Sequence, residues 1–174
     1  MSLITIILAI FAIAFTIFVG VIYASFCEYW LHRKVMHKPV GPFTYPYRTH
    51  ALTHHRMFDY DATYHLINPD QDKWTIPMAW WNGPVLTLLA TIPTIPFGIF
   101  ISWWICFIIA CTVFAYYLIY EYSHWCMHLP RPERQRLIER SWIFYRLNGH
   151  HLLHHRYMGM NFNVVLPIWD YILG

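Results

Sequence analysis

The sequence predicts an all-α integral membrane protein with three or four transmembrane helices and a histidine-rich helical cap. Three observations lead to this prediction. Hydrophobic residues make up 57% of the 174 residues and charged residues only 12%, whereas a soluble globular chain carries roughly a quarter charged residues. Two long stretches of the chain contain no charged residue. Twelve histidines are gathered in the remaining, more polar stretches. At this length we expect one membrane domain over residues 1–174.

The first uncharged stretch runs from the N-terminus to Cys27 and predicts a transmembrane helix over residues 3–27. Such a helix would be about 37 Å long at 1.5 Å per residue, enough to cross the roughly 30 Å hydrocarbon core of a bilayer. A cleaved signal peptide fits less well, because the stretch has no basic N-terminal region and exceeds the usual apolar core of about 7 to 15 residues. We expect the segment to be retained as an anchor.

The second uncharged stretch covers the 47 residues from 74 to 120. This is too long for one span and suits two spans joined by a tight turn. Two prolines and a glycine between positions 93 and 98 predict the turn, so we expect the spans at residues 77–95 and 99–120. A fourth, re-entrant helix is compatible with the same pattern.

Three crossings would leave residues 28–74 and 121–174 on the same side of the membrane, where they form the predicted metal-binding cap. All lysines and arginines fall in these two segments, so the positive-inside rule places the cap in the cytoplasm. Within it, residues 133–147 are expected to form an amphipathic helix in the membrane interface, ended by Asn148-Gly149. The net charge of only +3 gives little support to a nucleic-acid partner.

Ten histidines of the cap stand at spacings that suit metal ligands. They are His32, His37, His50, His54, His55, His124, His128, His151, His154 and His155. Ten imidazoles exceed what one ion can hold, but two ions with about five nitrogens each would use them all and leave positions for oxygen or water. A structural zinc site would need four ligands and a hydrolytic one about three. So many neutral nitrogen ligands favour iron and redox chemistry, and the four cysteines contain no Cys-x-x-Cys pair.

Helical spacing suggests how some of these side chains group. Residues three or four apart share one face of an α-helix. His50 and His54 should therefore lie on one face, with His55 turned towards a neighbouring position. His32 and His37 are five apart, so we expect them to approach a two-ion centre from two directions.

Four further polar residues are candidates for orienting the ligands from behind. Glu28 begins the first histidine-bearing segment, and Asn161, Asn163 and Asp170 interrupt an apolar C-terminal tail. Carboxylates and amides in such positions hold metal-bound imidazoles through their second ring nitrogen. For Glu28, a helix-end carboxylate at the lipid headgroups is an equally good interpretation. His65 has no partner at ligand spacing, which favours a structural role.

Taken together, the four histidine clusters resemble the histidine boxes of the membrane fatty acid hydroxylase and sterol desaturase superfamily. The boxes are His32-x4-His37, His50-x3-His54-His55, His124-x3-His128 and His151-x2-His154-His155, and the segments Asn161–Asn163 and Trp169–Gly174 are also similar to the C-terminal end of the family. The resemblance implies a non-haem di-iron monooxygenase that uses O2 as co-substrate and two external electrons to hydroxylate or desaturate a lipid C–H bond. It also implies that the ten histidines hold two iron ions (Fe2+/Fe3+).

The resemblance also bears on substrate and partners. An acyl chain from the bilayer is the favoured substrate, because carotenoid hydroxylases of similar size usually have a tighter second box; a carotenoid or sterol hydroxylase or desaturase is the alternative. The chain has no room for a fused cytochrome b5 domain, so a separate cytochrome b5, ferredoxin or reductase would donate electrons. A metal transporter would need ionisable groups along its spans, and these are absent. A non-catalytic partner subunit is the remaining alternative, which the intact boxes argue against.

Overall fold

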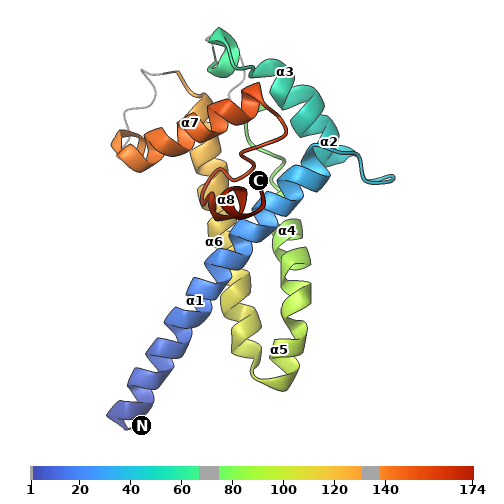
Figure 1. Cartoon of the computed structure of the whole chain (residues 1–174). Coiled ribbons are helices and arrows are strands. Elements are labelled where there is room, and N and C mark those ends of the chain that lie inside the picture. Colours follow the sequence, from blue (N-terminus) through green and yellow to red (C-terminus); the bar gives the residue numbers. More distant parts are fainter. Residues whose placement is uncertain (1, 67–74, 131–137) are drawn as a thin grey trace. The chain divides into compact units, whose positions relative to one another are not determined.

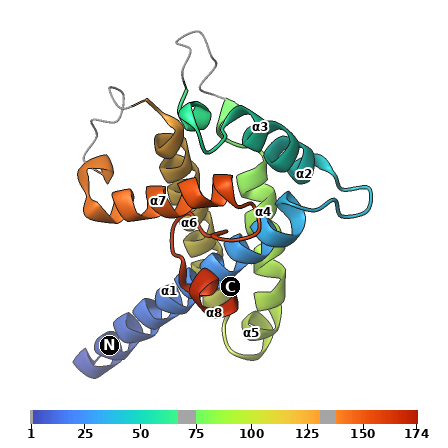
Figure 2. The same ribbon diagram turned by 45° about the horizontal axis from the view of Figure 1, so that its top comes forward.

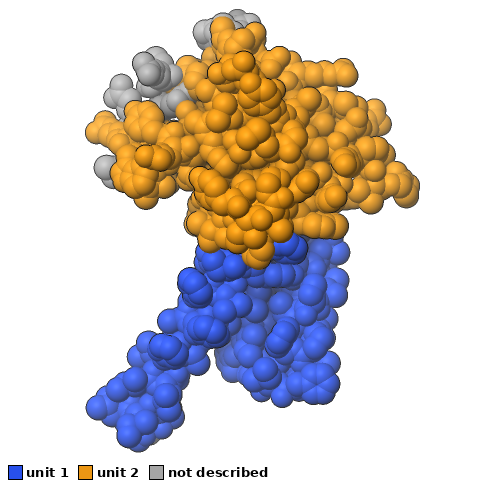
Figure 3. Space-filling model, viewed as in Figure 1, with its two compact units in different colours: residues 1–27, 80–118 blue, residues 28–79, 119–174 orange. Residues whose placement is uncertain are grey.

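The computed structural model describes residues 2–66, 75–130 and 138–174, and these residues form helices and loops without strands (Figure 1). The chain divides into two compact units, shown in different colours in Figure 3. Unit 1 consists of Met1–Cys27 and Trp80–Leu118, and unit 2 of Glu28–Ala79 and Ile119–Gly174. The first unit contains most of the apolar helical sequence, and the second contains all the histidines.

Three helical stretches are long and apolar enough to cross a membrane. They are Leu3–Met36, Asn82–Phe100 and Trp103–His128. The first comprises α1 (Leu3–Leu31) and the π-helix η1 (His32–Met36), the second comprises α4 (Asn82–Thr91), η5 (Ile92–Thr94) and α5 (Ile95–Phe100), and the third is α6 (Trp103–His128). Three predicted spans are thus confirmed as candidate membrane helices, and the described residues contain no fourth.

The turn between the second and third spans lies at Ile101–Ser102, after the segment predicted to form it. Pro93 and Pro96 occupy the first positions of η5 and α5, where the missing N–H removes no helical hydrogen bond. The helix therefore passes through both prolines. Gly98 serves packing, because a Cβ there would meet Trp103 at 2.7 Å.

Unit 1 is held together by close contacts between its helices. A Cβ on Gly20 in α1 would lie 3.1 Å from the side chain of Thr112 in α6. The hydroxyl of Tyr23 in α1 donates a hydrogen bond of 2.8 Å to the carbonyl of Ala90 in α4. Small residues and such interhelical hydrogen bonds are the means by which helices associate in an apolar solvent.

Unit 2 is built from short helices and the ends of the long ones (Figure 2). Its further elements are α2 (Tyr45–Thr49), the π-helix η2 (His50–His54), α3 (His55–Met57), η3 (Ala62–Tyr64), η7 (Ile138–Arg140), α7 (Trp142–Arg156) and α8 (Ile168–Leu173). Two apolar clusters fill its interior. One is centred on Cys126, Met127, Phe144 and Val164, and the other on Phe58, Leu66, Ile76 and Leu129.

The helix predicted at residues 133–147 differs from the observed structure. Residues 133–137 lie outside the described residues, and a new helix, α7, starts after Ser141, whose hydroxyl accepts a hydrogen bond from the amide of Phe144. Asn148-Gly149 does not end this helix, which continues to Arg156. The side chain of Asn148 instead accepts a hydrogen bond from the hydroxyl of Tyr64 at 2.9 Å. Tertiary contacts of this kind override the roughly 1 kcal/mol cost of a glycine inside a helix.

Candidate metal centre

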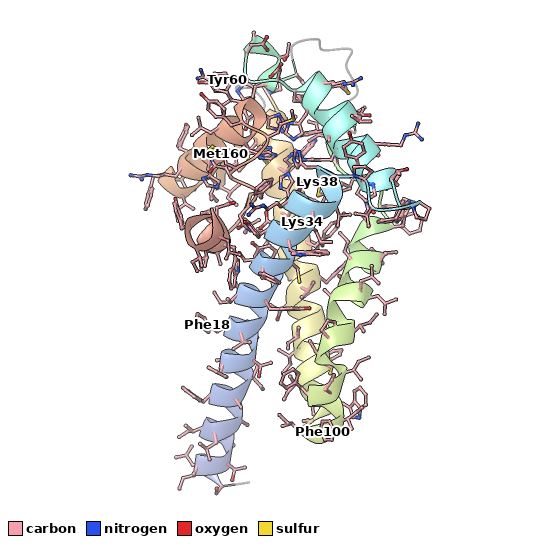
Figure 4. The ribbon with its side chains drawn as sticks, turned by 45° about the vertical axis from the view of Figure 1, so that its right-hand side comes forward. Phe18, Lys34, Lys38, Tyr60, Phe100 and Met160 are labelled. Carbon is pink, nitrogen blue, oxygen red and sulfur yellow. The ribbon has the colours of Figure 1, made fainter. Side chains whose placement is uncertain are left out.

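Ten histidine side chains converge in unit 2 and form two groups of five. Group A consists of His32, His37, His50, His55 and His154, and group B of His54, His124, His128, His151 and His155. Within each group, one ring nitrogen of every histidine lies within 4.8 Å of the others. In Figure 4 the labelled Met160 marks the loop whose backbone contacts group A.

The spacing of the nitrogens suits a metal ion at the centre of each group. The Nε2 atoms of His32 and His50 are 2.8 Å apart, and those of His128 and His151 are 3.3 Å apart. Imidazole nitrogens bind a transition metal at about 2.0–2.1 Å, so neighbouring ligands lie roughly 3 Å apart and opposite ligands about 4 Å apart. These two distances match the separation expected for neighbouring ligands of one ion.

Each group includes histidines from one helical segment that the other group does not use, and two further segments contribute histidines to both groups. The segment that carries η1 contributes only to group A, and α6 contributes only to group B. The segment His50–His55 and helix α7 contribute to both groups. In α7 the adjacent residues His154 and His155 separate into A and B because consecutive side chains point about 100° apart on an α-helix.

Two π-helices determine the grouping of the first five histidines, which differs from the expectation based on α-helical spacing. In a π-helix the hydrogen bonds join residues five apart, so these residues lie one above the other. His32 and His37 consequently share group A, with ring centroids 5.1 Å apart. His50 pairs with His55, Nε2 to Nε2 at 3.1 Å. His54, predicted to share a face with His50, belongs to group B.

In the regular α-helices, histidines four residues apart share a group, whereas His154, three residues after His151 and expected on the same face, belongs to the other group. His124 and His128 are four residues apart in α6 and both belong to group B. His151 and His155 have the same spacing in α7, and their Nε2 atoms are 3.0 Å apart. His65 lies outside both groups, with its ring against that of Tyr64.

Backbone carbonyls fix the orientation of four of these rings through Nδ1. The donor and acceptor pairs are His32 with Phe162 and His154 with Met160 in group A, and His128 with Tyr64 and His155 with Phe58 in group B. Donation from Nδ1 places the proton on that nitrogen, so the lone pair is on Nε2. The Nε2 atoms are the ones that converge within each group. An imidazole that donates from one ring nitrogen to a carbonyl and binds the metal through the other is typical of metal-bound histidine.

Burial keeps these imidazoles neutral. Removal from water lowers the pKa of His37 and of His155 to about 4. The pKa values of His50, His54 and His151 also lie well below the ordinary value, because of burial and then repulsion by neighbouring histidines. Since a metal ion binds the unprotonated ring, both groups are in the ligand form at neutral pH.

The donor set indicates the class of metal. Neither group, among the described residues, includes a carboxylate or a cysteine. Imidazole alone suits zinc, copper, iron and nickel, whereas magnesium and calcium prefer oxygen. Five ligands exceed the four of a closed structural zinc site. The residues therefore fit two transition-metal ions.

The four residues predicted to orient the ligands lie around the loop 160–164. Their hydrogen bonds join Glu28 to Asn163 Nδ2 and Val164 N, Asp170 to Phe162 N, Asn163 N and His150 Nε2, and Asn161 Nδ2 to the carbonyl of His150. None of these bonds reaches an imidazole of group A or B. The imidazole that Asp170 contacts is that of His150, which belongs to neither group.

A cavity of about 130 Å³ opens onto both groups. Its lining includes His50 of group A and His54 and His124 of group B, together with Ile76 and Met78. Sequence reasoning did not identify the last two: the predicted span 77–95 includes Met78, but helix α4 begins only at Asn82, which leaves Ile76 and Met78 in an irregular segment. Threonines also line the cavity, but two of them donate their hydroxyl hydrogens to backbone carbonyls of α2. The cavity therefore offers mostly apolar surface beside the histidines.

Comparison with known proteins agrees with this site. The model of the fatty acid hydroxylase family matches residues 17–174, a range that contains every histidine of both groups. Neither a curated protein nor a solved structure matches the chain significantly. Because the family match covers most of the sequence, the chain belongs to the fatty acid hydroxylase family, within the membrane fatty acid hydroxylase and sterol desaturase superfamily.

Proposed function

We propose that the protein is an O2-dependent di-iron hydroxylase that acts on a lipid, with an acyl chain as the favoured substrate. Family membership indicates an oxidoreductase. The observation that carries the proposal is the division of ten neutral imidazoles into two groups of five around two points. A metal transporter would need ionisable groups along its spans, and residues 3–27 and 74–120 contain no charged residue.

In this proposal group A and group B each hold one iron ion, and the bound irons supply the activation of O2 and the oxidation of the C–H bond. The histidines hold the metals and need not transfer protons. Carbonyls of the loop 160–164 and of the segment 58–64 keep four imidazoles with their lone pairs on Nε2. Burial of the rings limits the access of bulk water, which prevents side reactions, while the two protons that the reaction consumes are delivered together with the electrons. A separate cytochrome b5, ferredoxin or reductase donates the two electrons.

The cavity supports the choice of an apolar substrate. Its wall of Ile76 and Met78 faces a space bordered by His50, His54 and His124, so a methylene group placed there lies beside both centres. The amide of Met78 donates to the carboxylate of Glu121 at 3.3 Å, which holds this wall against α6. An acyl chain has no hydrogen-bonding groups that such a surface would leave unpaired.

Metal analysis of detergent-purified protein from iron-supplemented cells tests the proposal. We expect about two irons per chain in the wild type, in line with the two groups. The double variant His154→Ala, His155→Ala removes one ligand from each group and should lose most of the metal and all turnover. His65→Ala is the matched control, because His65 lies outside both groups, and should retain both ions.

Product analysis completes the test. Lipid extracts from cells that express the wild type should contain an oxygenated lipid that carries label from 18O2, absent with the double variant. One zinc per chain, or well-folded protein without metal, would contradict the di-iron assignment.

A further inference from the structure

The two groups of histidines are oriented by two different segments of the backbone. Group A is held by the loop 160–164, through the carbonyls of Met160 and Phe162. Group B is held by the segment 58–64, through the carbonyls of Phe58 and Tyr64. We therefore expect a change in one segment to act mainly on the group that it orients.

The carboxylate of Asp170 acts on the peptide that holds His32. The carbonyl of the Phe162–Asn163 peptide accepts the hydrogen bond from Nδ1 of His32, and the N–H of the same peptide donates to Asp170 Oδ2 at 2.7 Å. Asp170 Oδ1 accepts from the amide of Phe162 at 2.8 Å. Negative charge at the N–H end of a peptide polarises the peptide and makes its carbonyl a stronger acceptor, and such cooperativity grows where water is excluded. Asn163 is fully buried and Phe162 is 2% exposed.

Other contacts hold this peptide in place. Glu28 accepts hydrogen bonds from the side-chain amide of Asn163, at 2.9 Å, and from the backbone amide of Val164. Asn161 has a φ of 60°, in the left-handed region that asparagine tolerates better than most residues. Its side chain donates to the carbonyl of His150 in α7 at 3.1 Å. Two carboxylates and one amide thus fix the loop.

The corresponding peptide of group B lacks such a partner. The carbonyl of the Phe58–Asp59 peptide accepts from Nδ1 of His155, and its N–H donates to the neutral hydroxyl of Thr63 at 3.1 Å. Thr63 is partly buried, but the bond lies at the exposed surface of the segment. The hydroxyl of Thr63 in turn donates to Asp61 Oδ1 at 2.7 Å, so a carboxylate reaches this peptide only through an exposed hydroxyl.

We propose that Asp170 is a positioning residue that strengthens metal binding at group A through the Phe162–Asn163 peptide and has little effect on group B. The inference rests on the proposed function, because it requires metal ions at both groups. In metalloproteins a carboxylate that bonds directly to a ligand imidazole changes metal affinity by about 10- to 100-fold. Here one peptide is interposed, so we expect the lower part of this range.

Cobalt binding to single-centre variants of the full chain measures the effect. The double substitution His124→Ala, His151→Ala removes two ligands of group B and leaves group A intact. The double substitution His37→Ala, His50→Ala removes two ligands of group A and leaves group B intact. Asp170→Asn is introduced into each background, and Co2+ affinity is measured by competition with a chelator. We expect a loss of about tenfold at group A and less than about twofold at group B.

A matched control and a second variant keep the test decisive. Ile172→Ala changes an exposed side chain on the same helix, α8, and should alter neither affinity. If Asp170→Asn does not accumulate, Glu28→Gln acts on the same loop and should show the same preference for group A. Equal losses at A and B, or no loss at A, would overturn the inference and leave the di-metal proposal intact. Wild-type protein that binds no Co2+ would overturn both.

Discussion

At the scale of single residues, burial makes the metal-free protein sensitive to acid. The pKa of His37 and that of His155 are lowered to about 4 in the folded chain, against about 6.5 in an unfolded one. Between these values the unfolded state binds more protons than the folded state, so the free energy of unfolding falls as the pH is lowered. We expect the melting temperature of the metal-free protein to decrease steadily from about pH 6.5 to pH 4. A melting temperature unchanged over this window would contradict the assignment of neutral, buried imidazoles.

A second prediction at this scale concerns Met78 in the wall of the cavity. Met78→Trp adds a large ring to a space of about 130 Å³, while the backbone bond to Glu121 keeps the segment in place. We expect metal content to be unchanged and turnover of the lipid to fall by at least about tenfold, since a small displacement of the reacting carbon is costly. Met158→Trp, at an exposed position, should leave turnover unaltered. Loss of metal together with turnover would mean that Met78 supports the histidines instead.

At the scale of elements, the π-helices explain how histidines five residues apart can share one centre. Deletion of Lys34, which is exposed in η1, would convert the π-turn into an α-turn and bring His32 and His37 to a spacing of four, which also places them on one face. We expect this variant to retain both metal ions. Deletion of Leu153 from the regular helix α7 would rotate the two histidines that follow by about 100° and should cost at least one ion. Metal content per chain separates the two results, and loss of metal on deletion of Lys34 would show that the π-geometry itself is required.

The same elements show how far sequence reasoning reached. Spacing alone could single out ten histidines, because the α-helical pairs in α6 and α7 are visible as intervals of four. Spacing could not divide them correctly, since a π-turn leaves no periodicity in so short a segment: α-helical spacing predicts His54 on the face of His50, whereas the two belong to different groups. Glu28 contacts the loop 160–164 from more than one hundred positions away in the sequence. No local pattern encodes this contact or those of Asp170 with the same loop. The long spans were predictable from hydropathy, whereas the turn was misplaced because proline is tolerated in the first turn of a helix.

At the scale of the whole molecule, the distribution of charge predicts the orientation of the protein in the membrane. Three spans would place Ser2 and the turn at Ser102 on one side and every lysine and arginine on the other, so by the positive-inside rule we expect the histidines on the cytoplasmic side. Cysteines introduced at Ser2 or Ser102 should react with a membrane-impermeant maleimide in intact cells, whereas one at Lys38 should react only after the membrane is opened. Protein with only its four native cysteines gives the background. Labelling of Lys38→Cys in intact cells would reverse the orientation and require the electron donor to lie on the outer side.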